Sequence, residues 1–127
     1  MGRLNATMAD VYELFQRGMR LLESGEFHQA TVPLGKAAKI EPEKTSIREA
    51  LGRALFRSGQ YEEAAVEFEA VVERAPTNDY ALFCLGRSLL ECGRPDEARK
   101  PLVLAANLRP DRRDYRIYRD RARARAA

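Results

Sequence analysis

The stretch GRSLLECGRPDEARKPLVLAANLRP, residues 86–110, contains the positions that decide the fold. It carries two glycines seven residues apart, Gly86 and Gly93, followed by Ala98 and a closing Pro110. The same four positions recur twice before it, each time at the same spacing. A fixed period of about 34 residues predicts an array of helical repeats rather than a single irregular globule. The earlier copies are Gly52, Gly59, Ala64 and Pro76, and before them Gly18, Gly25, Ala30 and Pro42.

Apolar residues at helical spacing lie on both sides of the second glycine of each unit, and they predict two helices per unit. Polar residues that can cap a helix mark where these helices begin. We expect Thr7, with Asp10 three residues later, to open the first helix as a capping box. Thr45 is the expected N-cap of the third helix, and Asn78 or Asp79 is that of the fifth.

Glycine and proline mark where the helices end. Gly25 and its two copies provide the left-handed residue that closes the first helix of each unit. The second helix is expected to run from about residue 26 to residue 40, because Pro42 prevents its continuation. Pro33 and Pro101 fall inside second helices, where a proline costs up to about 3 kcal/mol. We expect a bend at each of them rather than a break.

Residues 109–127 form a separate basic segment. They carry eight arginines against three aspartates, whereas residues 1–108 carry 14 basic and 16 acidic side chains. Tyr115, Tyr118 and Ala122, together with Ile117, form a narrow apolar stripe at helical spacing. A seventh helix over residues 111–127 is therefore expected to cover the open end of the array. Arg–Asp pairs three or four residues apart are expected on its solvated face.

Length and composition fit one soluble domain. The 127 residues leave room for a single core, and charged residues make up 32% of the chain. No apolar run reaches the ~18 residues that a membrane span needs, and no signal peptide is recognisable. Cys84 and Cys92 are expected about 12 Å apart on one helix, too far for a disulfide. Free thiols favour the cytoplasm, and the excess of arginine over lysine hints at a bacterial origin.

Residues 11–110 resemble the tetratricopeptide repeat (TPR) family. The second unit shows the pattern with Leu51-Gly52, Ala64, Phe68 and Pro76. The resemblance implies an all-α fold, a right-handed α-solenoid of three helix-turn-helix units with a seventh C-terminal helix. The units are expected at about 11–44, 45–78 and 79–112, within one domain. Arg17, where leucine is usual, departs from the family pattern but leaves the close-packing positions intact.

The glycine and alanine columns imply a close contact between the two helices of a unit. Gly18, Gly52 and Gly86 are expected to face the repeated alanines, so that the helices approach closely. A side chain added at either position would overpack this contact and cost about 1–3 kcal/mol.

In the TPR family, residues of the first helices usually line the concave face. Carried onto this sequence, that face is apolar and contains arginines, where a purely structural spacer would be polar. Such a surface predicts an adaptor or scaffold that binds a peptide or helix of a partner protein. Arg53 and Arg87 can bind a ligand carboxylate bidentately, and Arg57 belongs to the same face. The expected groove residues are Tyr12, Phe15, Met19, Leu22, Arg53, Phe56, Tyr80, Phe83, Arg87 and Leu90.

Other interpretations of this face stay open. Some of its aromatic residues can pack between neighbouring repeats, and the groove can bury itself against a second copy in a homodimer or against its own tail. The carboxylate clamp that holds chaperone C-termini in this family is not matched. Phe15 and Met19 stand where the clamp has Lys and Asn, and Tyr80 and Cys84 replace its later basic pair.

The basic tail has a second interpretation besides that of a cap, namely contact with an acidic partner or nucleic acid. Nucleic acid is the less favoured partner, because Tyr115 and Tyr118 are explained by packing and no helix-turn-helix or single-strand module is visible. The residues that would make such a contact are Arg112, Arg113, Arg116, Arg119 and Arg123.

Catalytic motifs are missing from the sequence. His28 is the single histidine and has no recognisable nucleophile beside it. Metal-ligand spacings, a phosphate loop and a dinucleotide fingerprint are all lacking. We therefore expect no enzyme activity, no metal and no cofactor.

Overall fold

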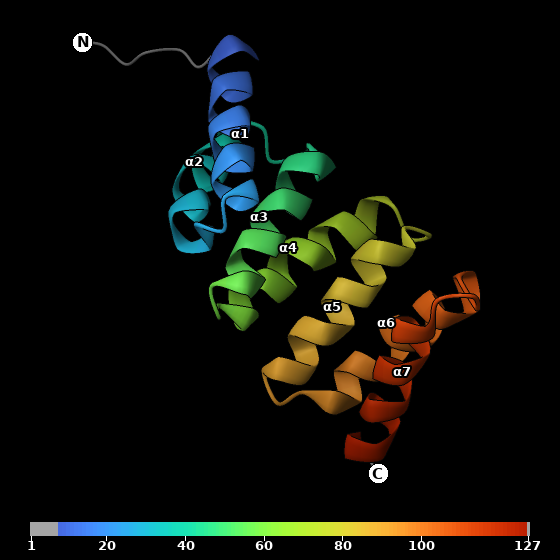
Figure 1. Ribbon diagram of the computed structural model, residues 1–127. Helices are drawn as coiled ribbons and strands as arrows, with labels where there is room; N and C mark the ends of the chain where they lie inside the picture. Colours follow the sequence, from blue (N-terminus) through green and yellow to red (C-terminus); the bar gives the residue numbers. More distant parts are fainter. Residues whose placement is uncertain (1–7, 127) are drawn as a thin grey trace.

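Each glycine pair of the sequence belongs to a helical hairpin, and the hairpins follow one another along the chain (Figure 1). The computed structural model describes residues 8–126. Over this range the chain forms helices and connecting turns, without strands. The helices are α1 (Met8–Glu23), α2 (Phe27–Ile40), α3 (Thr45–Arg57), α4 (Tyr61–Arg74), α5 (Asp79–Glu91), α6 (Pro95–Leu108) and α7 (Arg113–Ala126).

The helices stack in chain order, so that α1 and α7 lie at opposite ends of the molecule (Figure 1). Each helix packs mainly on its neighbours in the chain, with smaller contacts between α1 and α3 and between α5 and α7. The expected architecture is confirmed: three helix-turn-helix units form a right-handed α-solenoid, and a seventh helix follows them. The capping box expected at Thr7 lies outside the described residues.

A left-handed glycine ends the first helix of each unit, as expected. Gly25, Gly59 and Gly93 have φ values of 80°, 83° and 76°, a region that side chains other than glycine rarely adopt. After α3, the amide of Gly59 donates to the carbonyl of Phe56 at 3.0 Å, and the amide of Gln60 to that of Leu55 at 2.8 Å. These bonds satisfy carbonyls at the end of α3 and turn the chain into α4.

The glycines inside the first helices lie closest to a large apolar side chain of the second helix. A Cβ atom added at Gly52 would lie 2.9 Å from Cζ of Phe68, well inside van der Waals contact. The repeated alanines are also fully buried, but they lie one turn earlier in each second helix. Glycine is needed because it makes room for the bulky residue. The equivalent pairs are Gly18 with Leu34 and Gly86 with Leu102.

The helix starts agree with the sequence in one case and differ in another. Asn78 is the N-cap of α5, and its Oδ1 accepts a 3.1 Å hydrogen bond from the amide three residues later. The cap expected at Thr45 is wrong, because the turn before α3 brings the helix forward by one residue. Lys44 holds the cap position without a side-chain bond. α2 and α6 continue through their buried interior prolines, Pro33 and Pro101.

The outer face of α1 is polar, unlike the corresponding faces of α3 and α5. At the same register α3 has Ile47, Ala50, Leu51 and Ala54, and all four are buried. α5 has Ala81, Cys84, Leu85 and Ser88, which are buried apart from the half-buried Cys84. Arg17 departs from the family pattern together with its polar neighbours on this face, because α1 ends the stack and its outer face meets solvent. The α1 residues at this register are Glu13, Gln16, Arg17 and Arg20.

α7 takes the place of a first helix in a further unit. Tyr115 and Ala122 of the expected apolar stripe are fully buried and Tyr118 is half-buried, but Ile117 is exposed. Asp120 stands at the register position of the interior glycines. The Asp120 side chain fills the space that a closely packed second helix would need. α7 therefore closes this end of the stack, as predicted.

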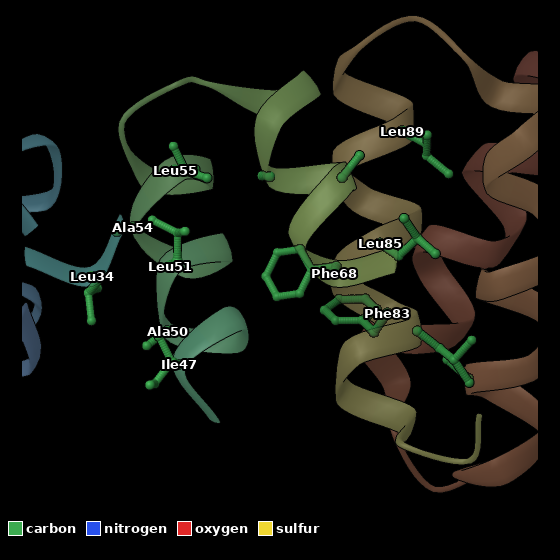
Figure 2. Close-up of a cluster of buried hydrophobic side chains, with 14 of the residues drawn as sticks. Leu34, Ile47, Ala50, Leu51, Ala54, Leu55, Phe68, Phe83, Leu85 and Leu89 are labelled. Atoms are coloured by element: carbon green, nitrogen blue, oxygen red, sulfur yellow. The ribbon is translucent and has the colours of Figure 1, made fainter. Parts of the chain in front are cut away.

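One apolar core joins the three units and α7. Buried side chains from all seven helices belong to it. Figure 2 shows part of this core, with Leu34 of α2, Leu51 of α3, Phe68 of α4 and Leu89 of α5. Side chains that the core does not use are left on the surface of the first helices, where the candidate site lies.

Candidate functional site

A pocket of about 420 Å³ opens between α3, α4 and α5. It combines three guanidinium groups with aromatic walls, and we call it the arginine pocket. Four of the ten expected groove residues meet in it, namely Arg53, Phe56, Tyr80 and Arg87. The complete lining is Arg53, Phe56 and Arg57 from α3, Phe68 from α4, and Tyr80, Cys84 and Arg87 from α5.

Arg87 lies within a cluster of aromatic rings. Its Cζ is 4.8 Å from the ring centroid of Phe56, 5.8 Å from that of Phe83 and 4.6 Å from that of Tyr118 on α7. Each close contact of this kind contributes about 0.5–1 kcal/mol. The Nε atom of Arg87 is buried and has no hydrogen-bond partner among the described residues. The rings thus hold the side chain while one strong donor stays unsatisfied.

The three arginines of the pocket form no ion pairs within residues 8–126. No carboxylate of that range lies within 4.0 Å of the guanidinium of Arg53, Arg57 or Arg87. Arg48, on the same helix as Arg53, is by contrast paired with Glu67 at 3.0 Å. The pocket therefore retains positive charge that no close ion pair in this range neutralises. The arginines that do form ion pairs are Arg48, Arg74, Arg94, Arg109, Arg112, Arg119 and Arg123.

Three titratable groups lie beside these arginines, and burial raises the pKa of each of them. Burial raises the pKa of Tyr80 to about 12, and the neighbouring Cys84 adds to the shift. Burial also raises the pKa of Cys84 to about 12, against the opposing effect of its hydrogen bond with Tyr80. The pKa of Glu49 is raised as well, because the effect of burial is larger than the opposing effect of the charge of Arg53. At neutral pH Tyr80 and Cys84 are uncharged, so Glu49 is the acidic group of these three that offsets part of the arginine charge.

A second, smaller pocket of about 230 Å³ lies at the other end of the stack, and we call it the α1 pocket. Tyr12 and Phe15 of the expected groove meet here. Tyr12 and Met8 are 64% and 71% exposed, which is unusual for large apolar side chains. Met19 is half-buried and packs against the core instead. The lining residues are Met8, Val11, Tyr12, Phe15, Gln16, Glu41, Lys44, Ser46 and Ile47.

Leu22 and Phe83 do not line a groove, contrary to expectation, because both are buried in the core. Leu90 is also buried, but its edge lines a separate surface pocket with Glu91, Gly93, Pro95 and Arg125. Phe83 is covered by α7: its ring stacks on Tyr115 at 4.5 Å and meets Tyr118 edge-on at 5.5 Å. The alternative in which aromatic residues pack between neighbouring elements therefore holds for Phe83. α7 covers the face of α5 on which Phe83 would otherwise be exposed.

The five tail arginines have different surroundings. Arg112 is paired with Asp114 at 2.7 Å, and Arg119 with Asp120 at 3.0 Å. These two pairs are one or two residues apart, whereas the pair of Asp120 with Arg123 has the expected separation of three. The other three are Arg113, which is exposed, Arg116, which donates to the carbonyl of Pro110, and Arg123, which lies 3.7 Å from Asp120.

Three residues of the site, Phe68, Cys84 and Arg121, were not expected there from the sequence. Phe68 lines the pocket although it is a core residue of a second helix, and no surface pattern reveals such a role. Arg121 has its Cζ 4.6 Å from the ring centroid of Tyr118, beside the pocket. A signal for Arg121 did exist, because Arg53, Arg87 and Arg121 follow one another at the same period as the glycines.

Cys84 and Cys92 are free thiols, as expected. Within residues 8–126, no group of three or more His, Cys, Asp and Glu side chains is arranged to hold a metal ion. In the same range, no helix has both the length and the apolar character that crossing a membrane requires.

The fold and the site define the class of protein: an α-solenoid of helical hairpins that presents an open, cationic pocket on its first helices. Two family models described as tetratricopeptide repeat match this chain, over residues 15–79 and 55–125. Each of them spans more than half of the sequence. The chain belongs to the tetratricopeptide repeat family. A comparison with curated proteins gave no match.

Solved structures share the fold at low sequence identity. The MamA RS-1 ArsTM double mutant superposes with a TM-score of 0.88 at 24% identity, over 94% of this chain and 67% of that chain. The first TPR of Spaghetti (RPAP3), bound to an HSP90 peptide, gives 0.84 at 16% identity, over 98% and 100%. The chaperone SycD of Yersinia enterocolitica, in complex with a peptide of the translocator YopD, gives 0.74 at 18%, over 94% and 91%.

Proposed function

We propose that this chain is a protein-interaction adaptor that holds a peptide or helix of a partner protein in the groove of its first helices, centred on the arginine pocket. The observation that carries the proposal is the combination of unpaired Arg53, Arg57 and Arg87 with an aromatic wall in an open pocket. Uncompensated charge beside apolar surface is a feature of binding sites, because packing alone does not need it.

Two structures with the same fold support this proposal. The Spaghetti TPR was solved with an HSP90 peptide, and SycD with a peptide of its translocator. Sequence identity to them is only 16% and 18%, so the likeness concerns the fold. The chemistry of the ligand must therefore be inferred from this chain's own residues.

The pocket suits one apolar side chain flanked by an acceptor. Phe56 and Phe68 supply apolar walls, and the protonated Cys84 adds a weakly polar surface. Arg53 and Arg87 can each donate two parallel hydrogen bonds to a carboxylate. An apolar residue next to an aspartate or glutamate matches this arrangement. Free thiols are consistent with the proposed cytoplasmic location.

The proposal is tested by selecting ligands from a library of random short peptides against the full chain and measuring their affinity for variants. Arg53→Gln removes one charge of the pocket and is expected to weaken binding about tenfold. Val66→Ala trims an exposed apolar side chain on α4, outside the pocket lining, and is expected to change nothing. Equal affinity of the selected peptides for all three proteins, or failure to select any peptide, would overturn the proposal.

Self-association through the same groove is the competing candidate, favoured by the exposure of Met8 and Tyr12 in the α1 pocket. Light scattering over a concentration series separates the two. A constant monomer mass supports the adaptor. A mass that rises with concentration and falls back in a Tyr12→Ala variant assigns the groove to a homodimer.

A further inference from the structure

The column of arginines in the first helices continues into α7. Arg53 of α3, Arg87 of α5 and Arg121 of α7 are separated by one repeat period each, and α7 takes the place of a first helix. Residues of one column lie on the same side of successive first helices, because each unit repeats the geometry of the one before. Arg121 thus extends the line of guanidinium groups beyond the third repeat.

Direct contacts join Arg121 to the arginine pocket. The Cζ atoms of Arg87 and Arg121 both lie 4.6 Å from the ring centroid of Tyr118. Arg87 in turn lies 4.8 Å from the ring of Phe56 in the pocket wall. Arginines and rings therefore alternate from α3 through α5 to α7, and the ring of Tyr118 contacts two cations. Gathering like charges costs free energy unless an anion offsets it.

Within the described part of the chain, Arg87 and Arg121 lack a carboxylate partner, as do several other arginines of α7. Within residues 8–126 no carboxylate pairs with Arg87 or Arg121, and Nε of Arg87 has no acceptor. Arg119 of the same helix is paired with Asp120. In the same range Arg113 and Arg125 of α7 are unpaired as well, but Arg121 differs from them because its guanidinium contacts the ring of Tyr118 beside the pocket.

We propose that α7 is a binding element as well as a cap: Arg121, together with Arg87, forms a second anion subsite that accepts side-chain carboxylates of an acidic segment in the partner protein. This rests on the proposed function and extends it by naming the chemistry of the partner. An acidic polypeptide fits better than a nucleic acid. Glu49, Glu23 and Glu91 lie on the same first-helix face, and they would repel a continuous phosphate backbone but tolerate spaced carboxylates.

The test uses the full chain and two fluorescent, end-blocked peptides. One carries glutamates on both sides of a leucine, and in the other each glutamate is replaced by glutamine. Amidation removes the terminal carboxylate, so only side-chain carboxylates can act. Arg121→Gln is compared with Arg99→Gln, which makes the same charge change at an exposed position on α6 outside both pockets. Circular dichroism checks that both variants fold.

The glutamate peptide is expected to bind at least tenfold more tightly than the glutamine peptide. Arg121→Gln is expected to weaken the glutamate peptide about fivefold to tenfold, and Arg99→Gln to leave it unchanged. Equal effects of the two variants overturn the role of α7. If Arg53→Gln still weakens binding in that case, the proposed function survives. Tighter binding to single-stranded oligothymidine than to the glutamate peptide, at the same salt concentration, overturns the acidic-protein assignment.

Discussion

The hydroxyl group of Tyr115 in α7 donates a 2.7 Å hydrogen bond to Oδ2 of Asp79, the first residue of α5. Tyr115 is fully buried, and Nη1 of Arg109 lies 4.0 Å from the same oxygen. This bond fixes where α7 lies against the third repeat. It thereby also sets where Tyr118 and Arg121, further along α7, meet the arginine pocket.

Tyr115→Phe is expected to destabilise the chain by about 1 kcal/mol, because it removes the hydrogen bond and leaves the oxygen of Asp79 with fewer donors. Urea denaturation measures the change. Hydrogen exchange in α7 should quicken more than in α3, because the bond holds α7 in place. Tyr12→Phe is the matched control, since Tyr12 is 64% exposed. An unchanged midpoint and unchanged exchange in α7 would show that the bond contributes nothing.

Stability is expected to fall as the pH rises above about 10. Burial, and then the hydrogen bond to Asp79, raise the pKa of Tyr115 above its ordinary value of 10.0. A group whose pKa is higher in the folded state stabilises the fold below the unfolded pKa, and that contribution is lost as the pH rises through the folded value. Denaturation curves from neutral to strongly alkaline pH measure this loss. The fall should be shallower in Tyr115→Phe, and parallel curves would contradict the assignment.

The sequence predicts the fold well because four columns repeat with one period, and each column has a local physical reason. Gly25 and its copies were assigned correctly because a left-handed turn depends on the residue itself. The sequence did not identify the bulky side chain that packs on Gly52, because a column shows which positions are small but not which side chain reaches across. Phe68 is the residue that does so.

The site was predicted only in part, because the repeat pattern does not show what the last helix covers. Arg53 and Phe56 both line the arginine pocket, because a first helix with neighbours on both sides repeats the same exposed positions. Phe83 was misplaced because it belongs to the last repeat, where α7 covers it. A periodic pattern predicts the exposed residues of a unit in the middle of the array, but the end units expose different residues. Tertiary packing of the seventh helix decides what the third repeat exposes.

Gly52→Ala and Gly35→Ala are expected to change stability in opposite directions. The methyl group at Gly52 would meet the Phe68 ring, which is itself buried, so we expect a loss of about 1–3 kcal/mol. At Gly35, inside α2, nothing lies within 4 Å of an added Cβ. The better helix propensity of alanine should therefore stabilise that variant by up to about 1 kcal/mol. Thermal denaturation of both variants checks the pair, and a stable Gly52→Ala protein would contradict the tight contact.

Arg87→Gln is expected to weaken the link between the third repeat and α7. The substitution removes the cation–π contacts with Phe56 and Tyr118, and we expect it to destabilise the chain by about 1–2 kcal/mol. It also removes the unsatisfied Nε donor, which offsets part of this loss. Arg99→Gln, an exposed change of the same kind, is the control for urea denaturation. If both variants unfold at the same midpoint, the aromatic cluster does not stabilise the fold through Arg87.

Cys84 is expected to resist alkylation and to report on occupancy of the arginine pocket. Burial raises its pKa to about 12, and that of Cys92 to about 11, from an ordinary value of 9.0. Only the thiolate reacts with iodoacetamide. At about pH 8, the rate of modification of either thiol should therefore be lower in the folded chain than in urea by a factor of about 100 or more. Cys84 should be the slower of the two. The variants Cys92→Ser and Cys84→Ser isolate the two rates for mass spectrometry.

A ligand in the pocket should slow Cys84 further, because Cys84 lines the pocket and Cys92 does not. A peptide that binds elsewhere would leave both rates unchanged. Rapid alkylation of Cys84 in the folded chain would mean that the thiol is more exposed or more ionised than its surroundings imply. In that case the pocket would be a polar, hydrated site, and an apolar side chain of a ligand would gain little there.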